Sequence, residues 1–335
     1  MQRRNLPLVT TYLVLAALTV ALPVVALLVG QGSLTDPALK ATFLGLRATR
    51  VAATWLAGAA LAVGGVVAQG LFRNPLVSPS ILGTTTGAML GGQLTILLYF
   101  HGLPLLHHLP GLGPAMVLSV GCLLGAEGSL FILLAFVRRR SDNLSLLLTG
   151  FILSALFLSV GGFVTSLAQD SWDLARAVVS FTLGGVSGIG VRQILLAAPL
   201  ILVPVVVLFF WSPSLDLLLS GEDEAQSLGV DVAPTRRWLT IWIAILTGAA
   251  VSIGGNVAFV GLIVPHVLRR FVGVHHRRLI PAAALGGGIF VVACDLVARL
   301  APTRSELPLG VVTGIIGAPL FLSLLARNAR GQLFG

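Results

Sequence analysis

Charged residues are scarce in this 335-residue chain: Asp, Glu, Lys and Arg make up 10% of it, against about a quarter of an ordinary soluble domain. Hydrophobic residues account for 56%, and the mean hydropathy is +0.99. A soluble protein of this length needs far more charge on its surface. The composition therefore excludes a soluble enzyme, a disordered chain and a nucleic-acid-binding domain, and it predicts a protein embedded in a lipid bilayer.

Lysine is almost absent, because the 21 basic residues include a single lysine, Lys40. The phosphate-binding loop of nucleotide hydrolases needs Gly-Lys-Ser/Thr, since the lysine reaches the nucleotide phosphates. No Gly-Lys pair exists in this chain, so ATP-driven work would require a separate polypeptide. The sequence also lacks a His-Glu-x-x-His motif, and we expect no catalytic residue, no metal site and no cofactor on this chain.

Cysteine is equally rare, with Cys122 and Cys294 each lying in an apolar run. Their spacing fits neither a metal site nor a disulfide framework. We expect both to be buried and to serve as small hydrophobic side chains.

Long apolar runs dominate what remains, and a membrane-crossing helix needs about 20 such residues. The pattern predicts an all-α polytopic membrane protein with about ten transmembrane helices, forming one domain over residues 1–335. Residues 171–190 are mixed and Gly-rich, which predicts a surface or half-inserted helix. The ten runs are 8–29, 47–70, 79–100, 113–137, 144–168, 193–211, 238–254, 257–270, 279–300 and 309–327.

An internal repeat relates two of these runs. Residues 58–68 read GAALAVGGVVA and residues 248–258 read GAAVSIGGNVA. The copies are five predicted spans apart, so they would cross the membrane in opposite directions, as in the inverted repeats of transporters. We therefore predict two inverted five-helix halves, about 1–170 and 191–335; chance similarity between Gly/Ala-rich helices is the alternative.

Most arginines fall in alternate loops, which by the positive-inside rule places both termini in the cytoplasm. The longest loop on that side is 212–237. Its sequence GEDEAQSLGV predicts a short amphipathic helix that ends at a glycine. Such a helix either docks on a soluble partner or is a solvated connection. The residues concerned are Gly221, Glu222, Ala225, Leu228 and Gly229.

Four stretches together resemble the FecCD family of ABC-transporter permeases, the membrane subunits that import iron–siderophores, haem and vitamin B12. Residues 73–88 are similar to its RNPLxxPxxLGxxxGA signature, and 221–230 to its cytoplasmic coupling loop. Residues 259–278 resemble FVGLIVPHxxR…HRR, and 295–319 resemble DxxAR…ELPxG…GAP. The resemblance covers almost the whole chain in the expected order.

This resemblance implies a homodimer in the bacterial inner membrane, with two ATP-binding cassette subunits inside and a periplasmic or extracellular substrate-binding protein outside. ATP and Mg would be bound by the partner ATPase, whose groove receives the coupling loop. The expected function is ATP-driven, alternating-access import of a metal chelate, an iron–siderophore or haem first and cobalamin second. The alternative is an ion-coupled secondary transporter that acts without an ATPase.

The resemblance also implies where the binding protein docks and where a gate lies. Arg47, Arg50 and Arg299 match the arginines that receive acidic residues of the binding protein. Arg47 and Arg50 could instead anchor lipid headgroups, and Arg299 could pair with Asp295 one turn earlier. The inner gate is expected at Asn74, Pro75, Leu76, Asn143 and Leu144.

Other polar residues in apolar surroundings are open to more than one interpretation. Glu127 lies within a predicted span, which makes it a functional candidate, although interior hydrogen bonding would serve equally. His101, His107 and His108 fall in a predicted outer loop and could contact a metal chelate, but a solvated loop is the better interpretation. His266 and His276 lie in cytoplasmic motifs, and a structural role is expected for both. Gly83, Gly87 and Gly91 would form a flat ridge for close helix packing.

Overall fold

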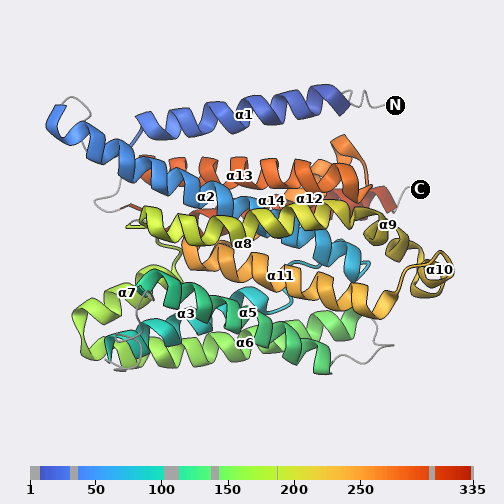
Figure 1. Ribbon diagram of the computed structural model, residues 1–335, viewed down its shortest axis with the longest axis horizontal. Helices are drawn as coiled ribbons and strands as arrows, with labels where there is room; N and C mark the ends of the chain where they lie inside the picture. The colour runs from blue at the N-terminus through green and yellow to red at the C-terminus, as the bar shows by residue number, and fades with distance from the viewer. Residues whose placement is uncertain are drawn as a thin grey trace.

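A computed structural model describes residues 8–30, 37–101, 113–136, 143–186, 188–301 and 306–332. Within these ranges the regular structure is entirely helical, and the helices run to and fro along one long axis (Figure 1). The helices that match the ten predicted runs are α1 (Leu8–Leu28), α2 (Pro37–Leu71), α3 (Thr84–Phe100), α5 (Pro114–Phe136), α6 (Asn143–Leu167), α8 (Val191–Phe210), α11 (Val232–Gly254), α12 (Val260–Val272), α13 (His276–Leu300) and α14 (Leu309–Gln332).

Seven helices in the described ranges are long and apolar enough to cross a membrane: α1, α2, α5, α6, α8, α11 and α13. The other three are shorter in apolar length, since α3 has 17 residues, α12 has 13, and α14 is apolar over Leu309–Leu324. The predicted all-α polytopic membrane fold is therefore confirmed, including the short eighth run.

Shorter helices fill the segments between the long ones. A short 3-10 helix, η1 (Ala168–Asp170), follows α6. The mixed region 171–190 then contains α7 (Trp172–Thr182). The predicted loop 212–237 contains α9 (Ser212–Ser220) and α10 (Glu222–Ser227). The start of α1, the end of α14, and both α9 and α10 lie at one end of the bundle, which we call the α10 end (Figure 1). The opposite end carries α7 and is called the α7 end.

Helix α2 forms the centre of the bundle and packs against α11, α12 and α13. It begins ten residues before the predicted run, because Lys40 interrupts the apolar pattern without interrupting the helix. Glycines allow its neighbours to approach closely. A Cβ atom on Gly65 would overlap the carbonyl oxygen of Gly261 in α12, and one on Gly58 would overlap that of Gly287 in α13.

The predicted glycine ridge of α3 packs against α5 in the same way. A Cβ on Gly87 would lie 2.5 Å from the carbonyl oxygen of Gly125, and one on Gly91 would overlap that of Gly121. Gly83 precedes the helix with a φ of +81°, a conformation that favours glycine. The ridge is therefore a helix-packing surface, as predicted.

The two copies of the internal repeat occupy α2 and α11, which lie side by side and run in opposite directions (Figure 1). The first copy is helical throughout, whereas the second leaves the helix at Gly255, whose φ is +61°. Antiparallel copies are what an inverted repeat requires. The division of the whole chain into two inverted halves stays a prediction.

Candidate functional site

The short helix predicted within 212–237 is α10. Its first turn carries Glu222, Asp223 and Glu224, and negative charge is favourable at a helix N-terminus. Beyond its last turn, Gly229 has a φ of +88°, and the Val230 amide donates to the Ala225 carbonyl at 3.0 Å. This is a Schellman ending, which requires a left-handed residue and so favours glycine. The local sequence therefore determines both ends of α10.

Most of α10 is exposed. Ala225 is buried against its neighbours, but the large side chain of Leu228 is 59% exposed. Glu222 accepts a hydrogen bond from Arg236 of α11 at 2.7 Å, and both side chains of this ion pair are partly exposed. An apolar side chain beside three carboxylates gives α10 a surface suited to a protein partner. Gly221, with a φ of +135°, separates it from α9.

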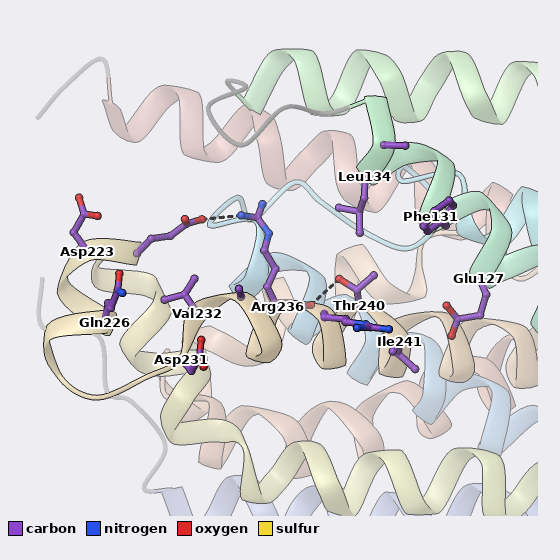
Figure 2. A pocket seen from close by; sticks show the side chains of 14 residues that line it. Glu127, Phe131, Leu134, Asp223, Gln226, Asp231, Val232, Arg236, Thr240 and Ile241 are labelled. Atoms are coloured by element: carbon purple, nitrogen blue, oxygen red, sulfur yellow. Dashed lines mark hydrogen bonds and ion pairs between the residues drawn. The ribbon is translucent and has the colours of Figure 1, made fainter.

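A cavity of about 940 Å³ lies between α5, α10 and α11. Glu127 is half-buried on α5, and Figure 2 shows its carboxylate turned toward α11 at one end of this cavity. The carboxylate of Glu127 therefore faces a cavity that is open to the surface. The lining residues are Glu127, Phe131, Leu134, Ala135, Glu222, Asp223, Gln226, Asp231, Val232, Ala233, Arg236, Arg237, Thr240 and Ile241.

At the α7 end, arginines and carboxylates from three segments form a network that we call the arginine–carboxylate network. Arg50 of α2 pairs with Asp295 of α13 at 2.8 Å and also with Glu306, which precedes α14. Asp295 pairs in turn with Arg299 one turn later. The side chains of Asp295 and Arg299 are 0% and 2% exposed, so these charges are paired away from solvent.

Two arginines also hold the C-terminus of α1. Arg47 donates to the carbonyl oxygens of Leu27 at 3.0 Å, Leu28 at 3.1 Å and Gly30 at 3.0 Å. Arg299 donates to the Ala26 carbonyl at 2.8 Å. The last carbonyls of a helix lack partners within the helix, and a cation there also opposes the negative end of the helix dipole.

The three arginines expected to dock a binding protein thus lie together at one end of the bundle. Their contacts described above lie within this chain: Arg47 and Arg299 are buried, and Arg299 makes the pair with Asp295 that the sequence left open as an alternative. Docking by Arg47, Arg50 and Arg299 stays a prediction.

The predicted gate residues are partly described. Asn74 is buried, and its side-chain oxygen accepts from the Leu76 amide at 2.9 Å, which fixes the turn after α2. Pro75 is exposed and Leu76 is half-buried. Asn143 and Leu144 begin α6, but their side chains lie outside the described residues, so their role as a gate stays a prediction.

The histidines divide between the two ends of the bundle. His101 is exposed at the end of α3, and its Nδ1 lies 2.9 Å from the Leu97 carbonyl of its own helix. His107 and His108 lie outside the described residues. His276, by contrast, is 1% exposed at the start of α13 and pairs with Asp216 of α9, which agrees with the structural role expected for it.

Sequence reasoning missed the pairing of two carboxylates with distant residues, Asp216 with His276 and Glu306 with Arg50. The signal for Asp216 was available: it is an acidic residue among leucines in a segment outside the long apolar runs. Glu306 lies 256 residues from its partner Arg50, and no local pattern links the two.

Comparison with known proteins places the chain in a family. The model of the FecCD transport family matches residues 6–327. The chain belongs to the FecCD transport family. Two curated relatives are the vitamin B12 import system permease protein BtuC of Vibrio cholerae, 40% identical, and the hemin transport system permease protein HmuU of Yersinia pestis, 36% identical. The first match covers 84% of this chain and 82% of BtuC; the second covers 88% of this chain and 86% of HmuU.

A solved structure supports the same FecCD assignment. It is an inward-facing conformation of a metal-chelate-type ABC transporter, with a TM-score of 0.80 and 31% sequence identity. The superposition covers 96% of this chain and 99% of that one. FecCD membership and the polytopic helical fold are therefore both shown, and the resemblance seen in the sequence motifs is confirmed.

Proposed function

We propose that this FecCD chain is the permease subunit of a binding-protein-dependent ABC importer, and that it moves a metal chelate across the bacterial inner membrane. The observation that carries the proposal is the pair α9–α10, a segment of 212–227 outside the long helices with an acidic, exposed tip. The chain that carries this segment has no Gly-Lys phosphate-binding loop, so we assign ATP hydrolysis to a partner protein.

In this proposal two ATP-binding cassette subunits bind ATP and Mg and hydrolyse the ATP, while this chain performs no chemistry. Helix α10 fits a groove on the ATPase through Leu228 and the carboxylates of its first turn. Closure of the ATPase pair moves α10, and the helices behind it open the pathway to one side and then to the other. Binding of the ATPase can favour one conformation of this chain only if its contacts with α10 differ between the two conformations.

The α10 end is assigned to the cytoplasm, together with both termini, and the α7 end to the outside. The substrate-binding protein then docks at the α7 end. Because Arg50 is paired with Glu306 there, an acidic residue of the binding protein would have to exchange with Glu306 to reach it. A homodimer would cover part of the apolar surface of α6, where Phe151 is 69% and Phe163 is 64% exposed.

The proposed substrate is an iron–siderophore or haem, with cobalamin as the next candidate. The relatives named above transport hemin and vitamin B12, which are both large metal chelates. We place the pathway at the dimer axis, with Asn74, Pro75, Leu76, Asn143 and Leu144 at its cytoplasmic gate. Selection among chelates then rests mainly on the binding protein.

The test is uptake into proteoliposomes. The chain is reconstituted with its ATPase and binding protein and offered haemin, cyanocobalamin or a ferric siderophore. We expect ATP-dependent accumulation of one of these and none when the ATPase is omitted. Accumulation by the chain alone under a proton or sodium gradient would support the ion-coupled alternative, for which Glu127 in its cavity would be the coupling group.

A further inference from the structure

The α10 end contains a polar contact between a buried histidine and a partly buried aspartate, His276 and Asp216, to which the proposed function assigns no role. Asp216 lies in the middle of α9, and its Oδ1 accepts two hydrogen bonds from the first residue of α13. The backbone amide of His276 donates at 3.0 Å, and the His276 ring nitrogen Nδ1 lies 2.6 Å away. The neighbouring His275 Nδ1 is 3.7 Å from the other carboxylate oxygen. We call these three residues the Asp216 junction.

One side of the junction is α13. The first four amides of a helix have no partner within it, and a carboxylate there also favours the positive end of the helix dipole. The side chain of His275, the N-cap residue of α13, accepts no hydrogen bond from these amides. Asp216 of α9 accepts one instead and so caps α13 from another part of the chain. The cap therefore joins two helices through residues that are 60 positions apart in the sequence.

The other side of the junction is the centre of the bundle. The His276 ring packs against α2 so closely that a Cβ on Gly70 would lie 2.6 Å from Nε2. Leu215, next to Asp216, is fully buried and would lie 3.3 Å from the same Cβ. Helix α9 is thus seated on α2 and α13 together, whereas α10 extends beyond it and packs against α9 and α11.

We propose that Asp216 is a positioning residue that fastens segment 212–227 to the N-terminus of α13, so that a displacement of α10 is passed to α13 and α2. This inference rests on the proposed function, because the displacement is the one imposed by the ATPase. The alternative contact from α10 to the long helices is the Glu222–Arg236 pair. That pair is partly exposed, and solvent-exposed ion pairs hold their partners weakly.

The first test measures substrate transported per ATP hydrolysed in the reconstituted complex. Asp216→Ala should lower this ratio about tenfold, in line with the loss of a charge-assisted hydrogen bond, while ATP hydrolysis continues. Asp216→Asn retains an acceptor for the His276 amide and should recover much of the coupling. Asp173→Asn, an exposed acid on α7, is the matched control and should keep the wild-type ratio. An Asp216→Ala complex that assembles and transports with the wild-type ratio would overturn the proposal.

The second test does not depend on the stability of the alanine variant. Spin labels at Ser227 on α10 and Val274 before α13, both exposed, report the distance across the junction. ATP binding should leave this distance unchanged in the wild type and in Asp216→Asn, because the two labels move together. A distance that changes with ATP in the wild type would contradict the proposal. A wild-type complex without ATP-dependent uptake would instead refute the proposed function, and the inference with it.

Discussion

The two ends of the bundle use charge in different ways. At the α7 end, Asp295 and Arg299 are buried and Arg50 is partly buried, and together they join α1, α2 and α13 to the segment before α14. At the α10 end, the acidic residues of α10 are exposed, and the Asp216 junction connects that region to the long helices. Buried paired charges make an end rigid because separating them leaves a desolvated charge without a partner. Exposed charges leave the α10 end able to bind a partner and to move.

The largest loss of stability is expected at the centre of the arginine–carboxylate network, where buried charges distinguish the α7 end from the α10 end. Asp295→Asn leaves Arg50 and Arg299 without the carboxylate that both contact, and we expect a loss of about 3–5 kcal/mol in the free energy of unfolding. Denaturant unfolding in detergent, followed by tryptophan fluorescence, measures it. The control is Asp173→Asn at the same end, which should cost at most about 1 kcal/mol. Equal losses in the two variants would show that the α7 end is not held by buried charge.

A smaller effect is expected where the Asp216 junction meets α2. Gly70→Ala places a methyl group against the His276 ring, which Asp216 holds in position, and overpacking of this kind costs about 1–3 kcal/mol. Gly64→Ala in the same helix is the control, because its Cβ would lie 3.4 Å from the nearest atom of Pro79, an ordinary contact. Unfolding of the two variants under identical conditions compares them. If Gly64→Ala proved the more damaging, the packing described for the junction would be wrong.

The smallest effect is a pH dependence at the Asp216 junction. Burial by itself raises the pKa of Asp216, but hydrogen bonds from the His276 ring and amide, with the charges of His276 and His275, lower the pKa below its usual value. A lowered folded pKa means that the stabilisation is present above the ordinary aspartate pKa of about 4 and is lost as the pH falls through the folded value.

The stability difference between wild type and Asp216→Asn should therefore shrink as the pH falls below about 4. Unfolding midpoints of both proteins between about pH 3 and about pH 5 would show this, and a difference that grows as the pH falls from about 4 to about 3 would contradict the assignment.

Local features of this chain could be predicted from the sequence, since they depend on residues close together. Ten apolar runs gave the long helices, and the acidic turn followed by Gly229 gave α10 with its Schellman ending. The glycine ridge of α3 was also predictable, because residues four apart share one helix face. The start of α2 was placed too late, since Lys40 interrupts the apolar pattern but does not stop the helix.

Pairings between distant residues could not be predicted. Arg50 meets Asp295 because α2 and α13 pack closely at their glycines, and that packing is a property of the whole bundle. The cavity beside Glu127 likewise needs α5, α10 and α11 to be placed together. Family resemblance located the arginines at Arg47, Arg50 and Arg299, but their internal partners became visible only in three dimensions.

The central claim is that ATP binding rearranges the helices at the α10 end relative to one another, while the helices at the α7 end keep their mutual arrangement. Two pairs of spin labels on the complete transporter test it directly: Leu28 on α1 with Leu300 on α13 at the α7 end, and Ser227 on α10 with Phe136 on α5 at the α10 end. All four side chains are exposed. We predict that ATP binding changes the distance between Ser227 and Phe136 and leaves that between Leu28 and Leu300 unchanged. A change between Leu28 and Leu300 as large as that between Ser227 and Phe136 would contradict the account.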